Sequence, residues 1–376
     1  AGTGKSYLIN AIRNLLQSTC VVTATIGKAS YNIRGVTVNS LLKLPVGPKG
    51  NKDLTGQSLC RLQESLRNMD YILIDEYSML GQSTLGWIDR RCKQATGMHN
   101  QVLGGKSLIL IGDPGQLPPV ADKPLYHDKP SSAIGEQGYQ TYRMFNKVIK
   151  LTVNQRVQGV STEQDQFRNL LLRLRKGECT SSDWHLLLTR QPSNVAELAS
   201  FKDSVRLFYS NEQVASYNHD QLNQLQHPVA CINAHHSSSI AKKMTPDDMS
   251  GLEPVVFLAK SAKVMLTMNL WPDVGLCNGA TGMIIDFIYH LNHQPPVLPV
   301  AVIVQFDDYR GPSISNTLPS CVPICPVTIS VNLPGSGIHE RQQLPLRLAY
   351  ALTIHKSQGL TLPKAWIDIG KSERTP

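Results

Sequence analysis

The stretch AGTGKS at residues 1–6, followed directly by a helical stretch at residues 7–16, decides how the rest of the chain is interpreted. It matches the second half of the phosphate-binding loop, whose full pattern is Gly, four residues, Gly, Lys and Ser or Thr. Bare backbone N–H groups from Gly2 to Lys5 and the positive end of the helix suit a phosphate, Lys5 neutralises its charge, and Ser6 offers a hydroxyl to magnesium. A chance Gly-Lys-Ser at the start of a helix is the alternative for so short a match.

Composition sets the broad class of protein. The chain has 376 residues, of which 41% are hydrophobic and 17% charged, so it can bury substantial cores and divide into two or more domains. Its 37 basic residues exceed its 28 acidic ones, and the net charge of +9 suits a polyanionic partner but is shared by many proteins that bind none. Apolar runs such as residues 297–306 are much shorter than the roughly 18 residues that span a bilayer, so no membrane segment is expected.

The eight cysteines are scattered without any Cys-x-x-Cys pair, which favours a reducing compartment. Cys321 and Cys325 with the distant pair His235-His236 offer an alternative, a zinc site. The paired spacing of zinc ligands is missing, so buried or unreactive thiols are the preferred interpretation.

Short apolar runs at residues 20–25, 69–76 and 106–113 predict buried parallel strands. The last two end in carboxylates, and ligands of open α/β sheets bind at the carboxyl ends of the strands. The sequence therefore predicts an α/β fold with its site at that edge. The Gly-, Pro- and Lys-rich residues 45–56 predict a surface excursion within a short insertion at about residues 45–65.

The predicted secondary structure changes twice in the second half of the chain. Residues 164–175 have helical spacing and residues 205–210 have strand character, which predicts a second α/β unit. Short β-like runs at residues 262–266, 281–288, 300–306 and 327–331, separated by turn formers, predict a small all-β insert. Residues 344–355 and 365–369 then read as a helix and a strand that return to the α/β pattern.

Polar residues at the predicted strand ends carry the chemistry of a nucleotide triphosphatase. Asp75 is placed to approach magnesium, and Glu76 to accept a proton from water. A solvated turn is the alternative for an Asp-Glu pair on its own. The stretch GDPGQLPP at residues 112–119 presents Gln116 on a rigid Gly/Pro turn, where it can sense the terminal phosphate or its attacking water.

These motifs, in this order, resemble those of the petite integration frequency (Pif-one-like) family of superfamily one B 5′-to-3′ DNA helicases, which are related to RecD-like helicases. The resemblance rests on residues 2–6, 23–29, 75–80 and 112–119. Its most specific match is TIHKSQG, within residues 344–361.

The resemblance implies a P-loop NTPase with two RecA-like parallel-sheet domains, the first at residues 1–150 and the second at 151–254 and 342–376. Residues 255–341 would be an SH3-like β insert in the second domain. It implies ATP and magnesium as cofactors, and single-stranded DNA and duplex junctions as partners. We expect an intracellular location, in the nucleus rather than the mitochondrion.

The family likeness also assigns roles to individual residues. Residues 151–156 resemble the segment with the first arginine finger, so the resemblance assigns that role to Arg156. Residues 211–218 resemble a further sequence block of the family. The nucleotide-binding set is Gly2, Thr3, Gly4, Lys5, Ser6 and Gly359, with Ser6 and Asp75 at the metal.

The expected DNA contacts come from both halves of the chain. They are Thr25, Lys28, Asn39 and Ser40, and, coupling DNA to the triphosphate site, His355, Lys356 and Gln358. Lys28 and Asn39 have an alternative as ordinary surface residues. Binding through backbone phosphates predicts slight sequence preference and strong salt dependence.

Several departures from the family pattern indicate a divergent branch. Asn39 stands where the family usually has His, residues 102–105 replace a more usual Pro-Phe-Gly-Gly, and Pro114-Gly115 replaces a common aromatic pair. The first glycine of the loop and the family's last motif, with a second arginine finger, fall outside residues 1–376, so we expect a chain truncated at both ends.

The hypothesis is an ATP-dependent DNA helicase that translocates 5′ to 3′ and unwinds duplex. The alternatives are a DNA-stimulated translocase or remodeller without strand separation, and a nucleotide-binding fragment inactivated by truncation. A non-catalytic DNA-binding derivative is disfavoured because Lys5, Glu76 and Arg156 are all present. A metabolic kinase with the same loop leaves Gln116 and the His355 run unexplained.

Overall fold

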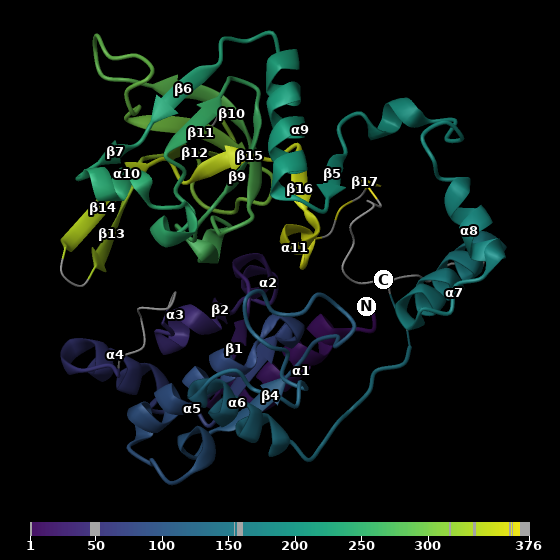
Figure 1. Cartoon of the computed structure of the whole chain (residues 1–376), viewed down its shortest axis with the longest axis vertical. Coiled ribbons are helices and arrows are strands. Elements are labelled where there is room, and N and C mark those ends of the chain that lie inside the picture. The colour runs from purple at the N-terminus through teal and green to yellow at the C-terminus, as the bar shows by residue number, and fades with distance from the viewer. Residues whose placement is uncertain are drawn as a thin grey trace. The chain divides into compact units, whose positions relative to one another are not determined.

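The computed structural model describes residues 2–45, 53–153, 155, 161–315, 317–333, 336–360, 362 and 364–368. The described residues form two compact units, unit 1 up to Ala199 and unit 2 from Ser200 onward (Figure 1). Each unit contains a parallel sheet, and each is described here by itself.

Unit 1 is built on a four-stranded sheet with the order β2-β1-β3-β4, in which every neighbouring pair is parallel. The strands are β1 (Cys20–Ala24), β2 (Val36–Thr37), β3 (Tyr71–Asp75) and β4 (Ser107–Leu110). The three strands predicted in this half are therefore confirmed, with slightly shorter bounds.

Alternating side chains of the strands enter two separate cores, because successive residues of a strand point to opposite faces of its sheet. Leu73 of β3 packs in a cluster with Ile9 of the first helix, whereas Ile72 and Ile74 belong to a second cluster with Leu85. Helices on both faces of a parallel sheet give the layered α/β architecture. The helices of unit 1 are α1 (Lys5–Leu16), α2 (Gly27–Asn32), α3 (Val38–Leu42), α4 (Gly56–Leu66), α5 (Gln82–Thr96), α6 (Ala133–Arg143), α7 (Thr162–Lys176) and α8 (Ser181–Leu188).

The short insertion predicted at about residues 45–65 is largely helical where the structure describes it. Helix α4 occupies its second half and buries Leu62 and Leu66 in the core of unit 1. Residues 46–52 lie outside the described residues.

Residues 151–199, which the sequence analysis assigns to the second domain, group with unit 1 in the structure. The helix predicted at residues 164–175 is confirmed as α7, and a bidentate ion pair of Arg173 with Asp183 joins it to α8. The division into domains drawn from the sequence stays a prediction.

Unit 2 contains a three-stranded parallel sheet with the order β16-β5-β17. Its strands are β5 (Val205–Phe208), β16 (Ala351–Thr353) and β17 (Ala365–Ile367), and helix α9 (Asn211–Gln224) follows β5. Asn218 of α9 is buried, and its side chain accepts a 2.8 Å hydrogen bond from the backbone N–H of Ala351. This bond ties α9 to β16.

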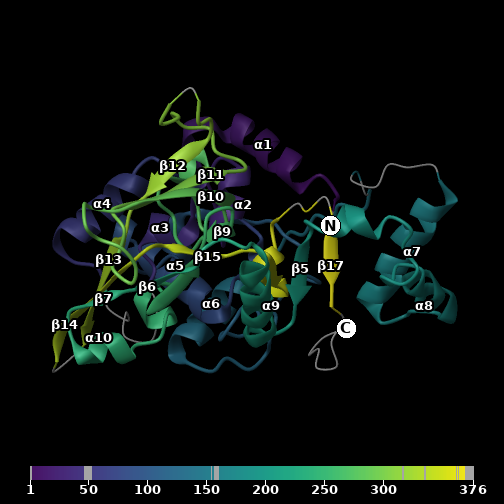
Figure 2. The ribbon, with the colours of Figure 1, turned by 90° about the horizontal axis from the view of Figure 1, so that it is seen from above.

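The remaining strands of unit 2 are antiparallel. A five-stranded sheet has the order β12-β11-β10-β9-β15, and Figure 2 shows β10, β11 and β12 side by side. Two smaller sheets, β13-β14-β7 and β6-β8, complete the region. The strands and the short helix α10 are β6 (Ala230–Asn233), β7 (His235–His236), α10 (Ser239–Lys243), β8 (Val255–Leu258), β9 (Lys263–Leu266), β10 (Thr281–Ile288), β11 (Ala301–Phe306), β12 (Cys321–Ile324), β13 (Val327–Leu333), β14 (Gly337–Gln343) and β15 (Leu346–Leu348). The predicted β-rich stretch is confirmed, while its SH3-like character stays a prediction.

The helix predicted at residues 344–355 is wrong. The segment forms strands β15 and β16 and only then a single helical turn, α11 (Ile354–Ser357). Leu344, Leu346 and Leu348 alternate with Pro345 and Arg347, which suits a strand, and the two strands pair with β9 and β5. Tertiary pairing therefore overrides the helix-forming composition of the stretch.

Among the described residues, no helix combines the length and the apolar character needed to cross a membrane.

Candidate functional site

The phosphate-binding loop has the backbone conformation that its sequence predicts. Gly4 adopts φ 85°, in the left-handed region, and stands at the N-terminus of α1. It has no side chain with which to cap the helix, so the first N–H groups of α1 stay available to an anion. The loop is also held by the backbone N–H of Gln155, which donates a 2.7 Å hydrogen bond to the carbonyl of Gly2.

Asp75 and Glu76 lie where β3 ends. The Asp75 side chain is buried and accepts a 2.9 Å hydrogen bond from the backbone N–H of Glu76. Burial raises the pKa of Asp75 to about 6, the N–H of Glu76 lowers it, the nearby Glu76 carboxylate raises it and the charge of Lys5 lowers it. Lys5 is thus within electrostatic reach of Asp75.

This environment fits a divalent cation. A carboxylate that burial pushes toward its neutral form is kept ionised by a bound cation, which supplies the missing positive charge. Glu76 adopts φ 55°, in the left-handed region, so the chain leaves its extended course directly after Asp75. Ser6 is exposed at the start of α1.

Gln116 stands on a turn after β4 that Asp113 organises. The Asp113 carboxylate accepts a 3.1 Å hydrogen bond from the N–H of Gly115, and its carbonyl accepts one of 3.0 Å from the N–H of Gln116. Within the described part of the chain, the buried Oε1 of Gln116 has no hydrogen-bond partner. An orphaned buried acceptor marks a position where a donor is expected to bind.

Arg175 of α7 completes the turn. Its Nη1 donates a 2.7 Å hydrogen bond to Oδ2 of Asp113, and its Nη2 pairs with Oδ1. Burial raises the pKa of the Asp113 carboxyl and the hydrogen bonds from Arg175 and Gly115 are among the causes that lower it, so that it lies well below its usual range. No role was predicted for Asp113 or Arg175 from the sequence. Asp113 carried a signal as the carboxylate at a strand end, whereas Arg175 carried none, because its partner is 62 residues away.

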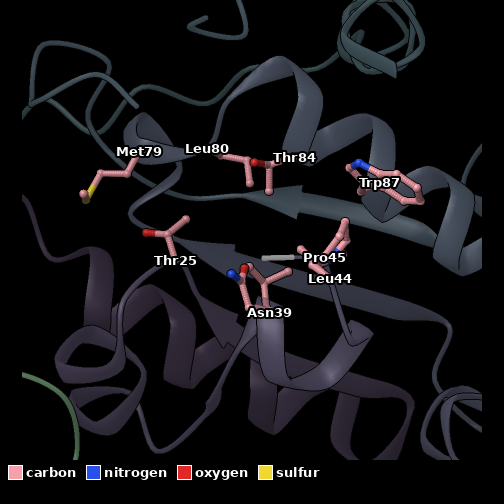
Figure 3. Close-up of a pocket in the computed structure, with 9 residues that line it drawn as sticks. Thr25, Asn39, Leu44, Pro45, Met79, Leu80, Thr84 and Trp87 are labelled. Atoms are coloured by element: carbon pink, nitrogen blue, oxygen red, sulfur yellow. The ribbon is translucent and has the colours of Figure 1, made fainter. Parts of the chain in front are cut away.

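Two of the predicted DNA contacts share a pocket of about 170 Å³ in unit 1 (Figure 3). Thr25 and Asn39 lie on one side of it, facing Leu80 and Thr84, with the ring of Trp87 at one end. Thr25 donates a 3.1 Å hydrogen bond from its hydroxyl to the Glu76 carbonyl. The wall that carries Thr25 is therefore bonded to the carboxylate turn.

The other two predicted contacts in unit 1 follow strands of the same parallel sheet. Lys28 is half-buried on α2, after β1, with its ammonium 5.6 Å from the centre of the Tyr31 ring. Ser40 is exposed on α3, after β2, and its N–H is capped by the Thr37 hydroxyl at 3.2 Å. All four predicted contacts thus follow the carboxyl ends of β1 and β2.

The remaining predicted residues belong to unit 2 or lie outside the described residues. His355 and Lys356 are exposed on α11, Gln358 is buried, and Gly359 has φ 76°. Arg156 lies outside the described residues. No group of three or more His, Cys, Asp or Glu side chains that could hold a metal occurs in the described ranges.

Parallel sheets, a phosphate-binding loop and polar strand ends define a P-loop fold of the helicase type, and comparison with solved structures agrees. A Pif1 helicase from Candida albicans matches with a TM-score of 0.72 at 24% identity, over 99% of this chain and 83% of that one. A Pif1 helicase from Bacteroides, in complex with ADP-AlF3 and single-stranded DNA, matches with a TM-score of 0.71 at 23% identity, over 99% and 81%.

Sequence comparison finds similarity to one family of helicases. The model of the PIF1-like helicase family matches residues 1–185. The human ATP-dependent DNA helicase PIF1 is 28% identical over 99% of this chain and 53% of its own length, and the Campylobacter jejuni Pif1 is 25% identical over 98% and 81%. Residues 1–185 are therefore similar to the PIF1-like helicase family, and the chain spans about half the length of the human relative.

Proposed function

We propose that the chain is an ATP-driven DNA motor that moves 5′ to 3′ along single-stranded DNA and unwinds duplex at junctions. The observation that carries the proposal is the edge of the unit 1 sheet, where Asp75, Glu76 and the pocket wall around Thr25 are joined by hydrogen bonds. A nucleotide site and a DNA-facing surface so connected suit an enzyme that couples the two ligands.

Each residue of the nucleotide site has a separate part in this proposal. Backbone N–H groups of Gly2, Thr3 and Gly4 hold phosphate, and Lys5 neutralises it. Ser6 and Asp75 hold magnesium, which when bound offsets the charge of the phosphates. Glu76 accepts the proton of the attacking water, and Gln116 orients that water.

Two residues of the proposed site come from elsewhere in the chain. Arg156 stabilises the charge that develops on the transferred phosphoryl group, as arginine fingers do. Gly359 contributes to nucleotide binding. Both assignments are supported by the motifs around them, NQR at residues 154–156 and HKSQG at residues 355–359.

The proposed DNA path uses neutral and basic donors, which suit phosphate oxygens. In unit 1 it comprises Thr25, Lys28, Asn39 and Ser40, supported by the shared pocket and by their positions after β1 and β2. In unit 2 it comprises His355, Lys356 and Gln358, supported by exposure of the first two at the carboxyl end of β16. A Bacteroides relative crystallised with single-stranded DNA agrees with this choice of ligand.

The test measures ATP hydrolysis with and without single-stranded DNA, and then unwinding of duplexes that carry a 5′ or a 3′ tail. We expect DNA to stimulate hydrolysis and only 5′-tailed duplexes to be unwound. Hydrolysis that ignores DNA would contradict the motor, and unwinding from 3′ tails alone would contradict the polarity. Stimulated hydrolysis without unwinding of either duplex would favour a translocase.

A further inference from the structure

The turn that carries Gln116 needs an external support. Its backbone is organised by the Asp113 carboxylate, which accepts the N–H of Gly115 at 3.1 Å. Two prolines and a glycine surround Gln116, and the first Pro has no N–H to add to the turn. The position of the Gln116 side chain therefore depends on what holds Asp113.

Arg175 holds Asp113 through both of its carboxylate oxygens. The side chain of Asp113 is 9% exposed and that of Arg175 is 42% exposed, so the carboxylate sits inside the site and the arginine reaches it from the surface. A planar guanidinium matches the two oxygens of a carboxylate, which fixes geometry as well as charge.

The guanidinium also lies directly against the backbone of the turn. A Cβ added at Gly115 would stand 2.7 Å from the central carbon of the Arg175 guanidinium. Only a glycine permits so close an approach. Arg175 thus contacts the turn twice, through the Asp113 carboxylate and across the Gly115 backbone.

The segment that carries Arg175 is fastened to the nucleotide site at a second point. The N–H of Gln155 donates to the carbonyl of Gly2 in the phosphate-binding loop, and α7 begins soon after, at Thr162. Gln155, which belongs to the predicted arginine-finger segment, thus bonds the loop a few residues before the helix whose last turn reaches Asp113.

We infer that Arg175 is a positioning residue for ATP hydrolysis, which holds the turn of residues 113–116 so that Gln116 faces the terminal phosphate. This inference rests on the proposed function. It assigns Arg175 a part distinct from an arginine finger, because both of its terminal nitrogens bond the Asp113 carboxylate.

The same helix provides a matched control. Arg173 makes the same kind of bidentate ion pair with a buried aspartate, but its partner is Asp183 of α8. Removal of Arg173 therefore tests the cost of losing such a pair from α7 without touching the Gln116 turn.

The experiment compares R175A, R175K and R173A with the unaltered chain. Steady-state hydrolysis with saturating single-stranded DNA gives kcat and KM, and hydrogen exchange resolved to single residues gives the protection of the Gly115 and Gln116 amides. The Ile111 amide, which is bonded to the Ile74 carbonyl inside the sheet, is the internal reference.

We expect R175A to lower kcat by roughly 10- to 100-fold with KM changed by less than about twofold, because misplacing a catalytic group impairs the chemical step. R175K should recover only part of the loss, because an ammonium cannot bond both oxygens. R173A should keep kcat within about twofold of the unaltered chain. The Gly115 and Gln116 amides should exchange faster in R175A alone, with Ile111 unchanged.

Unchanged kcat in R175A, or an equal loss in R173A, would overturn the inference. If the unaltered chain does not hydrolyse ATP, the proposed function fails, and the exchange data still decide the structural claim. In that case unchanged exchange of Gly115 and Gln116 in R175A would show that Arg175 does not hold the turn.

Discussion

The parallel sheets of the two units share one architecture and differ in what stands at their carboxyl ends. In unit 1, β3 ends in Asp75 and the chain after β4 reaches Asp113. In unit 2, β16 leads into α11 with exposed His355 and Lys356. One edge is acidic beside a phosphate-binding loop, and the other offers donors to an anion. The comparison teaches that strand ends, and not the sheet itself, decide which ligand a unit suits.

The two edges also differ in how firmly they are supported. β3 is a central strand of five residues with a core cluster on each face. β16 is an edge strand of three residues, backed by the small cluster of Leu207, Met265, Ala349 and Leu352. The residues proposed for the chemical step stand on the better supported sheet, as catalytic geometry requires.

The largest effect is expected from a substitution at the acidic edge of the unit 1 sheet. E76Q keeps the shape of the side chain but removes the proton acceptor, so kcat for DNA-stimulated ATP hydrolysis should fall by roughly 10² to 10⁴. Nucleotide binding should persist, as measured by titration with a fluorescent ATP analogue. The control is E64Q, which changes an exposed glutamate on α4. Turnover like that of the unaltered chain in E76Q would remove Glu76 from the proposed base role.

The next largest effect is expected from substitutions at the basic edge of the unit 2 sheet. Replacing both His355 and Lys356 by Ala removes donors to phosphate, so affinity for single-stranded DNA should fall by at least about tenfold. Fluorescence anisotropy with a labelled oligonucleotide measures this, and K242A, at an exposed lysine of α10, is the control. Equal affinity in the double variant and the unaltered chain would exclude α11 from the DNA path.

A smaller effect tests whether the unit 1 edge also meets DNA. If Lys28 neutralises one phosphate, K28A should reduce the slope of log K against log salt by about 0.7. The slope is obtained from binding titrations over a series of salt concentrations, and K147A changes an exposed lysine outside the proposed contacts. A slope that K28A leaves intact would return Lys28 to an ordinary surface residue.

The smallest effect concerns the helices that group with unit 1. The Arg173 guanidinium, together with the Thr180 N–H, holds the pKa of Asp183 below its usual range. A lowered folded-state pKa gives stability that is present above the unfolded value and lost as pH falls through the folded value. D183N should therefore lower the Tm at pH 7 and have a diminishing effect as pH falls below about 4.

Thermal unfolding followed by circular dichroism across this pH range measures the difference between D183N and the unaltered chain. T189A, at an exposed residue next to α8, is the control. A difference in Tm that does not shrink with falling pH would mean that the ion pair is not its cause.

Much of unit 1 was predictable from its sequence because the signals are local. β-branched apolar runs bounded by polar residues mark β1, β3 and β4, and carboxylates follow the last two of them. The phosphate-binding loop is readable for the same reason, since its conformation is set by Gly4 and the helix that follows. The candidate residues Lys5, Asp75 and Glu76 were therefore found without any tertiary information.

Where the sequence analysis failed, the deciding contacts come from distant parts of the chain. Residues 344–355 have the composition of a helix, yet β9 and β5 draw them into two strands. Helix-forming propensity amounts to a few tenths of a kcal/mol per residue, which strand pairing and burial readily exceed.

By itself the sequence determined the class of fold, the position of the phosphate-binding loop and the acidic strand ends, because each depends on residues close together in the chain. Only the tertiary structure decided that Thr25 and Asn39 share a pocket with Trp87, and that Arg175 supports the turn of Gln116. Neither contact leaves a local pattern in the sequence, because the partners are far apart in the chain. They interact only after folding has brought them within contact distance.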